Sequence, residues 1–354
     1  MAGYILRRLL IMPLLLIGVT LLIFVMLSAL TPYERASLYV QDIPKRQGAI
    51  EAVIEKYGLD EPIHVQYINW MFGRRDADTG MIEGGVLRGD LGWSKVGKSS
   101  VAEVLGRRLP ATLELALWAA IPMLGIGIWL GVLAAVRHNT ASDQVLRVAS
   151  IIAWSIPTFV FGLIMLMIFY AKLDWFPPER LSEWALREVQ SDSFHAITRM
   201  YTIDSLLNMR MDIFADSLRH LVLPVLTLAL LNWAFMLRVT RSSMLETMRH
   251  DYVRQARAKG LHERKVIWRH AVPNGLIPVI TVGGLVLIGL LNGVVITETV
   301  FNWPGMGSFM ADAALSLDVI SVLGVTLFSG MILIFGNLLV DVLYGVVDPR
   351  VRLR

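Results

Sequence analysis

Long apolar runs separated by charged segments dominate the chain. Six runs of 17 to 27 residues contain no charged side chain. They are Leu9–Leu30, Leu115–Val136, Val148–Ala171, Leu221–Leu237, Ala271–Thr297 and Val319–Val340. A helix of about 20 apolar residues crosses the hydrocarbon core of a bilayer, and a soluble core rarely needs six such runs. The pattern therefore predicts an all-α membrane protein with six transmembrane helices.

The first run differs in length from the apolar region of a cleaved signal peptide. Arg7 and Arg8 precede it, as basic residues do in a signal peptide. The apolar region of a signal peptide is about 7–15 residues long, whereas Leu9–Leu30 has 22 residues. We expect residues 1–31 to be retained as the first transmembrane helix.

Basic residues are concentrated on one side of the predicted membrane. Residues 1–8, 137–147, 238–270 and 348–354 carry 16 Lys and Arg in 59 residues, whereas the alternate segments carry 17 in roughly 150. The positive-inside rule assigns the denser set to the cytoplasm, so both termini are expected there and the protein in the cytoplasmic (inner) membrane. Topology thus explains the pI of 9.4, and nucleic acid is not expected as a partner.

Composition narrows the class of protein further. Hydrophobic residues make up 55% of the 354 residues and charged residues 18%, which excludes an ordinary soluble enzyme. The chain has no Cys, which excludes disulfides and a Cys nucleophile, and its His residues show no metal-ligand spacing. We expect three parts: the first helix at 1–31, an extracytoplasmic loop region at 32–111, and a five-helix core at 112–354 with a cytoplasmic loop at 240–275. In the outer loop we expect a short helix at Ile50–Tyr57, ended by Gly58, and an amphipathic segment near the membrane interface at Ile63–Phe72.

The cytoplasmic segment 238–275 predicts two helices joined at a glycine. Ser242–Lys259 favours helix, Gly260 supplies a stop, and His262–His270 is a second helical piece closed by Pro273. Such a projecting helix could dock into a groove on a partner. A basic loop that merely anchors on anionic lipid is the alternative.

The same segment resembles the "EAA" loop of ABC importer permeases. That pattern runs Glu-Ala-Ala, three residues, Gly, nine residues, Ile, one residue, Leu-Pro, and here Arg254, Gln255, Ala256, Gly260, His270, Val272 and Pro273 occupy its positions. Only Ala256, Gly260 and Pro273 match strictly. Where the sequence differs from this pattern, it resembles the version of the loop in the dipeptide/oligopeptide permease branch. Two stretches carry this resemblance, DYVRQARAKGL at Asp251–Leu261 and RHAVPNGLIPVI at Arg269–Ile280.

Further stretches resemble that branch in the same order along nearly the whole chain. They are GYILRRLL at Gly3–Leu10, GLDEPIHVQYINW at Gly58–Trp70, GDLGWS at Gly89–Ser94, RLPATLELAL at Arg108–Leu117, SIPTFVFGL at Ser155–Leu163, LRHLVLPVLTLAL at Leu218–Leu230, TETVFNWPGMG at Thr297–Gly307 and NLLVDVLYGVVDPRVR at Asn337–Arg352. The resemblance implies a type I ABC importer transmembrane domain. It also implies a second permease subunit, two cytoplasmic ATPases that bind MgATP, and an extracytoplasmic substrate-binding protein. The stretch GWSKVGKS at Gly92–Ser99 fits the pattern GxxxxGK[ST], but it lies in the predicted outer loop, where no ATP supply is expected, so we expect no cofactor and no ATP hydrolysis in this chain.

The resemblance implies that Tyr252–Lys265 carries a coupling helix. The candidate ATPase-coupling residues are Arg254, Gln255, Ala256, Arg257, Lys259, Gly260, Leu261 and Pro273. Ala256 is small enough for close approach, and Gly260 permits the sharp turn that presents the helix. The basic side chains could meet acidic groups on an ATPase, or could simply form a solvated face.

The fifth run suggests residues for the pathway or for helix packing. Gly289 and Gly293 form a GxxxG pair, which allows close helix contact inside the membrane domain, along the pathway or at a permease–permease seam. Asn292 could line the pathway or bond to a neighbouring helix. For Glu298 we expect a structural role, through hydrogen bonds to the 301–307 turn.

The resemblance leaves several classes of transported solute open. Import of di- and oligopeptides is the first interpretation, and import of oligosaccharides or nickel chelates by the same transporter class is the alternative. A secondary transporter or channel is a different class, but an ion-coupled carrier usually shows midplane acids or an inverted repeat, and neither is found. A membrane receptor would predict a soluble signalling domain, which is also not found.

Overall fold

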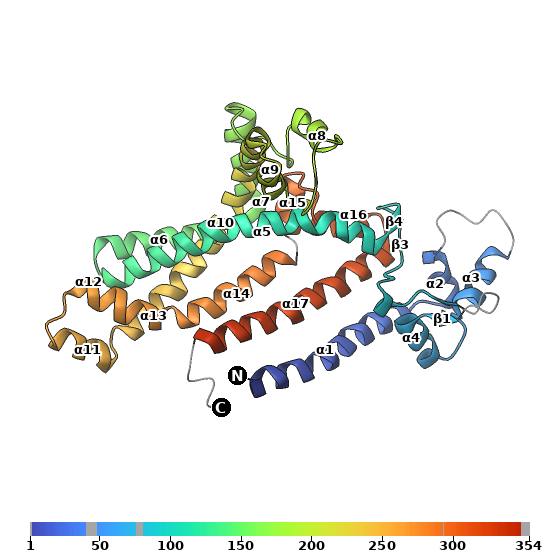
Figure 1. Ribbon diagram of the computed structural model, residues 1–354, viewed down its shortest axis with the longest axis horizontal. Coiled ribbons are helices and arrows are strands. Elements are labelled where there is room, and N and C mark those ends of the chain that lie inside the picture. The colour runs from blue at the N-terminus through green and yellow to red at the C-terminus, as the bar shows by residue number, and fades with distance from the viewer. Residues whose placement is uncertain (1, 40–47, 76–80, 293, 348–354) are drawn as a thin grey trace. The chain divides into compact units, whose positions relative to one another are not determined.

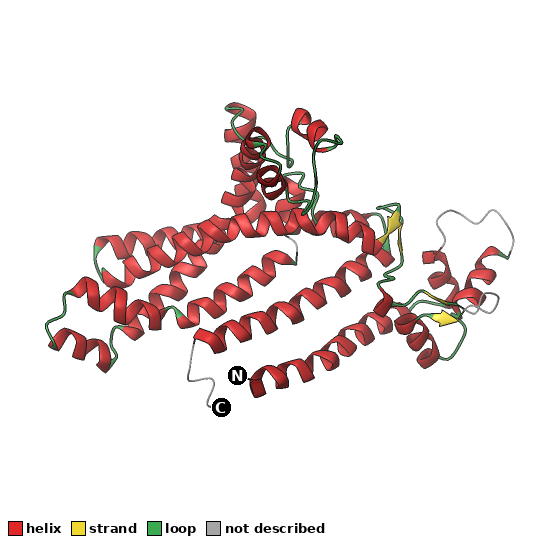
Figure 2. Ribbon diagram, viewed as in Figure 1, coloured by secondary structure: helices red, strands yellow, loops and turns green. Residues whose placement is uncertain are grey.

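Helices make up most of the computed structural model, which describes residues 2–39, 48–75, 81–292 and 294–347 (Figure 2). Contacts divide the chain into two compact units. The first contains Met1–Ile5, Pro110–Ser308 and Phe335–Arg354, and the second contains Leu6–Leu109 and Phe309–Ile334. The sequence-based division at residues 1–31, 32–111 and 112–354 stays a prediction.

Each of the six apolar runs overlaps a candidate membrane span. Four single helices are long and apolar enough to span, and two bent helix pairs raise the number to six if each pair is one span. The single spans are Leu9–Ser28, Val101–Val136, Met211–Leu230 and Val319–Val342. The bent pairs are Ala141–Ser155 with Thr158–Lys172, at 95°, and Glu263–Gly275 with Ile277–Leu291, at 50°. The predicted six spans therefore hold when each bent pair is counted once.

The third and fifth runs, which contain Pro157 and Pro278, are each divided between two helices. In the third, Ile156 is extended (φ −85°, ψ 123°) and Pro157 precedes the next helix. Proline disfavours helical geometry in the residue before it and cannot donate a backbone hydrogen bond, so the helix breaks there. In the fifth, Pro278 lies in the first turn of a new helix that ends at Leu291, six residues before the predicted Thr297.

Figure 1 shows the helices, whose bounds are as follows. Those lying wholly or mostly in the first unit are α5 (Val101–Val136), α6 (Ala141–Ser155), α7 (Thr158–Met165), the π-helix η2 (Leu166–Lys172), α8 (Glu183–Val189), α9 (Tyr201–Leu207), α10 (Met211–Thr247), α11 (Asp251–Ala258), α12 (Glu263–Lys265), the π-helix η3 (Val266–Ala271), α13 (Val272–Gly275), α14 (Ile277–Leu291) and α15 (Val295–Val300). Helices α1 (Ala2–Ser28), α16 (Met306–Leu315) and α17 (Val319–Val347) extend from one unit into the other, as α5 does.

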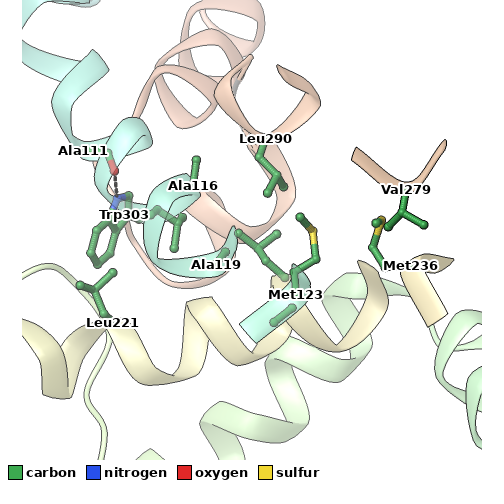
Figure 3. Close-up of a cluster of buried hydrophobic side chains, with 12 residues drawn as sticks. Ala111, Ala116, Ala119, Met123, Leu221, Met236, Val279, Leu290 and Trp303 are labelled. Atoms are coloured by element: carbon green, nitrogen blue, oxygen red, sulfur yellow. Dashed lines mark hydrogen bonds between the residues drawn. The ribbon is translucent and has the colours of Figure 1, made fainter. Parts of the chain in front are cut away.

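The core of the first unit lies between α5 and α10. Leu115, Ala119 and Met123 of α5 are buried in one cluster with Leu221 and Met236 of α10 (Figure 3). The indole Nε1 of Trp303 donates a hydrogen bond to the Ala111 carbonyl at 2.9 Å in the same cluster. At Gly131 a Cβ atom would lie 2.5 Å from Thr240 Cβ, so the absence of a side chain allows the two helices to approach closely.

The second unit contains the outer loop region and its short elements. They are α2 (Pro32–Tyr39), α3 (Ala49–Tyr57), α4 (Ile63–Phe72), the 3₁₀-helix η1 (Val86–Arg88), and the two-residue strands β1 (Arg74–Arg75), β2 (Ile82–Glu83), β3 (Trp93–Ser94) and β4 (Ser99–Ser100). The helix predicted at Ile50–Tyr57 is confirmed, and Gly58 ends it in a left-handed conformation, whereas the segment Ile63–Phe72, expected only to be amphipathic, is the helix α4. Two antiparallel strand pairs, β1–β2 and β3–β4, are small additions to the predicted all-α fold.

Asp318 ties the start of α17 to the β3–β4 turn within the second unit. Its Oδ2 accepts hydrogen bonds from Ser94 Oγ at 3.0 Å, Val96 N at 3.1 Å and Ser321 Oγ at 2.6 Å. Burial alone would raise the pKa of this carboxyl, but the hydrogen bonds outweigh it and the pKa is lowered. The carboxylate is therefore the form that the fold stabilises.

Replacing Asp318 by Asn is expected to destabilise the protein by about 1–3 kcal/mol at neutral pH, because an amide cannot accept all of these hydrogen bonds. Since the folded-state pKa is lowered, the carboxylate's contribution to stability is present above the unfolded pKa of about 3.9 and is lost as the pH falls through the folded value.

Thermal unfolding in detergent between pH 7 and pH 3 should show the stabilities of Asp318→Asn and wild type converging at acid pH. Asp312→Asn, at an exposed site, is the control. Equal stability of Asp318→Asn and wild type at pH 7 would contradict the assignment.

Candidate functional site

Helix α11 is an amphipathic helix that begins after the cytoplasmic end of α10. Asp251 lies in its first turn, where a negative charge complements the helix dipole. Val253 and Ala256, three residues apart, lie on one face and are buried, at 0% and 6% exposure. The spacing places both side chains toward the rest of the chain.

The buried face of α11 packs in a cluster that reaches two long helices. Val253 and Ala256 lie together with Met244 of α10 and Val132 of α5. The other buried members are Ala135, Val266, Ile267, Ala271 and Val272. Figure 1 shows α11 and α12 at the end of α5 where that helix finishes. Ala256 thus permits close approach within this chain, and its role in contact with an ATPase stays a prediction.

Gly260 forms the turn after α11, as predicted. Its φ of +73° is in the left-handed region, and its N–H bonds to the Arg257 carbonyl at 2.9 Å. No described atom lies within 4 Å of a Cβ placed there, so the backbone conformation, not a close contact, requires glycine. Arg257 Nη2 contacts Glu263 Oε1 at 2.7 Å across the turn, and this hydrogen bond raises the pKa of Arg257.

The other face of α11 is exposed. Arg254, Gln255, Ala258 and Lys259 all face away from the cluster, whereas Leu261 is half-buried and packs against it. The nearest ion pair of Arg254 is to Asp251 at 3.9 Å, and both side chains are largely exposed. The coupling candidates therefore divide into an exposed cationic face and a buried apolar face.

A cavity of about 420 Å³ lies just before α11, lined by Arg241, Ser242, Leu245, Glu246, Arg249 and His250.

Pro273 does not close the second helix of the loop. It lies in the first turn of α13, which continues directly from the π-helix η3, and its side chain is exposed. The prediction of a helix end at Pro273 was wrong, because helical backbone continues from η3 through Pro273 to Gly275.

The glycines predicted to pack in the fifth run behave differently from one another. No described atom lies within 4 Å of a Cβ placed on Gly289, so Gly289 makes no close helix contact within the described chain. Gly293 lies outside the described residues. Close approach occurs instead at Gly284, where a Cβ would lie 2.5 Å from Val340 Cγ2, and at Gly283, where it would lie 3.0 Å from Leu124 Cδ2. A role of Gly289 at a permease–permease seam stays a prediction.

Asn292 ends α14 and is half-buried. Its Nδ2 donates to the Ile288 carbonyl of its own helix at 3.2 Å. Its Oδ1 is buried and has no hydrogen-bond partner among the described residues. The contacts therefore do not distinguish the two predicted roles, lining the pathway or bonding to another helix.

Glu298 is fully buried and connects α15 to two other segments. Its Oε1 accepts from Thr112 Oγ1 of α5 at 2.8 Å, and its Oε2 accepts from Ser308 N of α16 at 2.8 Å. A Cβ on Gly305 would lie 2.3 Å from the Glu298 Cδ, so glycine leaves room for the carboxylate. The backbone carbonyl of Glu298 also accepts from Trp303 N at 2.7 Å. These contacts are the structural hydrogen bonds to the turn that the sequence suggested.

A buried ion pair that sequence reasoning missed holds the outer segment 178–207 to α5. Arg180 Nη2 donates to Glu114 Oε2 at 2.6 Å, and the two side chains are 8% and 1% exposed. Glu114 Oε1 accepts from both Thr202 N and Thr202 Oγ1, at 2.7 and 2.8 Å. The guanidinium lies 3.9 Å from the centre of the Tyr201 ring. A single arginine in a proline-containing loop carries no local signal for such a pair.

The described residues contain no group of three or more His, Asp or Glu side chains that could hold a metal ion. The stretch Gly92–Ser99 contains β3 and the turn that leads to β4, so it forms a two-stranded hairpin, whereas a phosphate loop joins a strand to a following helix.

Comparison with known proteins shows similarity along the whole chain. Residues 127–353 match the family described as binding-protein-dependent transport system inner membrane component. Residues 1–116 match the N-terminal region of the same kind of membrane component.

Individual relatives cover nearly the full length. The chain is 37% identical to an oligopeptide transport system permease protein of Bacillus subtilis, over 99% of this chain and 100% of the relative. It is 35% identical to a di/tripeptide transport system permease protein of Pseudomonas aeruginosa, over 99% of each chain. A dipeptide transport system permease protein of Escherichia coli is 36% identical, again over 99% of each chain.

Proposed function

The chain belongs to the family of binding-protein-dependent transport system inner membrane components, and on this premise we propose that it is a permease subunit for the import of di- and oligopeptides. The observation that carries the proposal is the similarity, over 99% of this chain, to permease proteins whose names specify oligopeptide, di/tripeptide and dipeptide transport. As a transport component, the chain is not a catalytic subunit.

Besides this chain, the proposed complex contains three further kinds of protein. A second permease subunit forms the other half of the pathway, two cytoplasmic ATPases bind MgATP, and an extracytoplasmic binding protein delivers the peptide. The family description supports the binding protein directly. The exposed cationic face of α11 supports a cytoplasmic partner, because Arg254 and Lys259 face away from the packed core.

The proposed coupling runs from α11 into the membrane helices. An ATPase contacts the exposed face, and the buried face carries the movement, because Val253 and Ala256 share a cluster with Met244 of α10 and Val132 of α5. The Arg257–Glu263 pair keeps α11 and α12 together across the Gly260 turn. ATP can shift the permease between two states only if it binds the ATPases better in one of them.

Vesicles reconstituted with the permease pair, the ATPases and the binding protein provide the test. Uptake of radiolabelled Ala-Ala is expected, and it should require both internal ATP and the binding protein. Uptake of an oligosaccharide or a nickel chelate in place of peptide would reject peptide import. Flux through vesicles that contain this chain alone would reject the ABC mechanism in favour of a channel or secondary transporter.

A further inference from the structure

An exposed tryptophan with basic neighbours lies where the cytoplasmic loop enters the membrane. The segment Glu263–Gly275 leads into α14 with a bend of 50°, and Trp268 lies in its π-helix η3. Trp268 is 53% exposed, whereas tryptophan is highly buried on average in folded proteins. Arg264, Lys265 and Arg269 are exposed as well. These four residues are called the Trp268 surface below.

The helical spacing gathers the four side chains on one side of the segment. Arg264 and Trp268 are four residues apart, as are Lys265 and Arg269, and residues at this spacing are neighbours on a helix surface. The opposite side is apolar, since Val266 is fully buried in the cluster that α11 shares with α5 and α10. The segment therefore has one side in the coupling cluster and the Trp268 surface on the other.

The basic side chains of the Trp268 surface are not neutralised within the described chain. None of the three forms an ion pair within 4 Å with a residue that the structure describes. Glu263, the carboxylate of α12, instead pairs with Arg257 of α11 at 2.7 Å. Three positive charges thus surround an exposed apolar ring, and this combination is complementary to an anionic group that is joined to an apolar one.

An anionic phospholipid combines these two chemistries at the depth where the Trp268 surface lies. Tryptophan is enriched at the headgroup level of a bilayer, and the negative potential of the cytoplasmic leaflet attracts basic side chains next to a span. The 50° bend turns Glu263–Gly275 away from the axis of α14. The exposed side of such a tilted amphipathic segment can lie along the membrane surface.

We propose that the Trp268 surface binds the headgroups of anionic phospholipids in the cytoplasmic leaflet. The three basic side chains contact the phosphate groups, and the indole lies beside the glycerol backbone and the upper acyl chain. The exposed face of α11, with Arg254 and Lys259, stays available to an ATPase. Docking and lipid anchoring, the two interpretations of the cytoplasmic loop, then apply to two different faces. The inference does not depend on which solute the protein transports.

Quenching of Trp268 fluorescence by brominated lipid tests the site. The full chain is reconstituted in phosphatidylcholine vesicles that contain a rising fraction of either acyl-brominated phosphatidylglycerol or acyl-brominated phosphatidylcholine. Because the chain has 10 Trp residues, the signal of Trp268 is the difference between wild type and Trp268→Phe. Half-quenching is expected at an at least about tenfold lower fraction of the anionic lipid, because each basic side chain adds attraction for its headgroup.

A matched pair of double variants tests whether this surface, and not the charge of the whole loop, selects the lipid. Lys265→Gln with Arg269→Gln is expected to reduce the preference for phosphatidylglycerol at least about fivefold. Arg254→Gln with Lys259→Gln removes the same charge from exposed positions of the same loop and should leave the preference unchanged. An equal reduction in the two double variants would overturn the assignment to the Trp268 surface.

The remaining outcomes concern the membrane contact itself. Equal half-quenching fractions for the two lipids would overturn recognition of the headgroup charge, and no quenching of Trp268 by either lipid would overturn the contact with the bilayer. The measurement is then repeated on the complete transporter. Preserved quenching there supports the lipid site, whereas loss of quenching when the ATPases or the second permease are added would assign the Trp268 surface to a protein partner and overturn the proposal.

Discussion

Replacing Ala256 by arginine is expected to abolish ATP-driven transport while the subunit still inserts in the membrane. Ala256 is 6% exposed and packs with Val253, Val266 and Ile267. Leaving an uncompensated charge buried costs about 3–5 kcal/mol. Helix α11 would therefore leave the cluster rather than bury the guanidinium, and its movement would no longer be transmitted to α5 and α10.

The same substitution two positions later is the control. Ala258 is exposed on α11, so Ala258→Arg should leave the thermal stability of the subunit and its resistance to trypsin unchanged. Ala256→Arg should make the loop rapidly cleavable at Arg257 and Lys259, and ATP hydrolysis by the complex should no longer respond to the binding protein. Wild-type transport by Ala256→Arg would refute the role of the buried face.

The membrane spans could be predicted from the sequence because the bilayer imposes a length that any spanning helix must satisfy. The apolar run Val148–Ala171 meets that length whether the helix is straight or bent. Pro157 indicates a weak point in this run, but Pro122 and Pro224 lie inside the continuous helices α5 and α10. Whether a proline breaks a helix depends on the neighbouring helices, and so the 95° bend could not be predicted from this run alone.

The coupling loop was partly predictable for a local reason. The turn at Gly260 follows from the chemistry of a single residue that tolerates positive φ. The inward direction of Ala256 also had a local signal, because Val253 and Ala256 have the i, i+3 spacing of one helix face. The small size of Ala256 predicted a close approach without saying to what, and this spacing points to the rest of the chain.

The buried polar contacts were not predictable because they join distant parts of the chain. Arg180 meets Glu114 across 66 positions, and Glu298 meets Thr112 across 186. No periodicity links such pairs. The GxxxG pair, by contrast, is a local pattern whose close contact is not made at Gly289 within the described chain, so its role at a permease–permease seam stays a prediction.

Replacing Arg180 by methionine is expected to destabilise the protein strongly, by about 3–5 kcal/mol, because Glu114 then stays buried without its counter-charge. Methionine keeps much of the length of the side chain and its contact with the Tyr201 ring. The first unit should unfold at a lower temperature, and protease should cut the outer segment 178–207 faster, since this segment loses its attachment to α5. Arg187→Met is the control, because the Arg187–Glu183 pair is exposed and such pairs contribute little.

A second substitution distinguishes a missing charge from a missing shape. In the double variant Arg180→Met, Glu114→Gln the buried carboxylate is gone, and a neutral amide can still accept the hydrogen bonds from Thr202 N and Thr202 Oγ1. The double variant should therefore be more stable than Arg180→Met alone, although it carries one substitution more. If it were less stable by the sum of the two single effects, the two side chains would act independently, and the ion pair would not be what attaches the outer segment to α5.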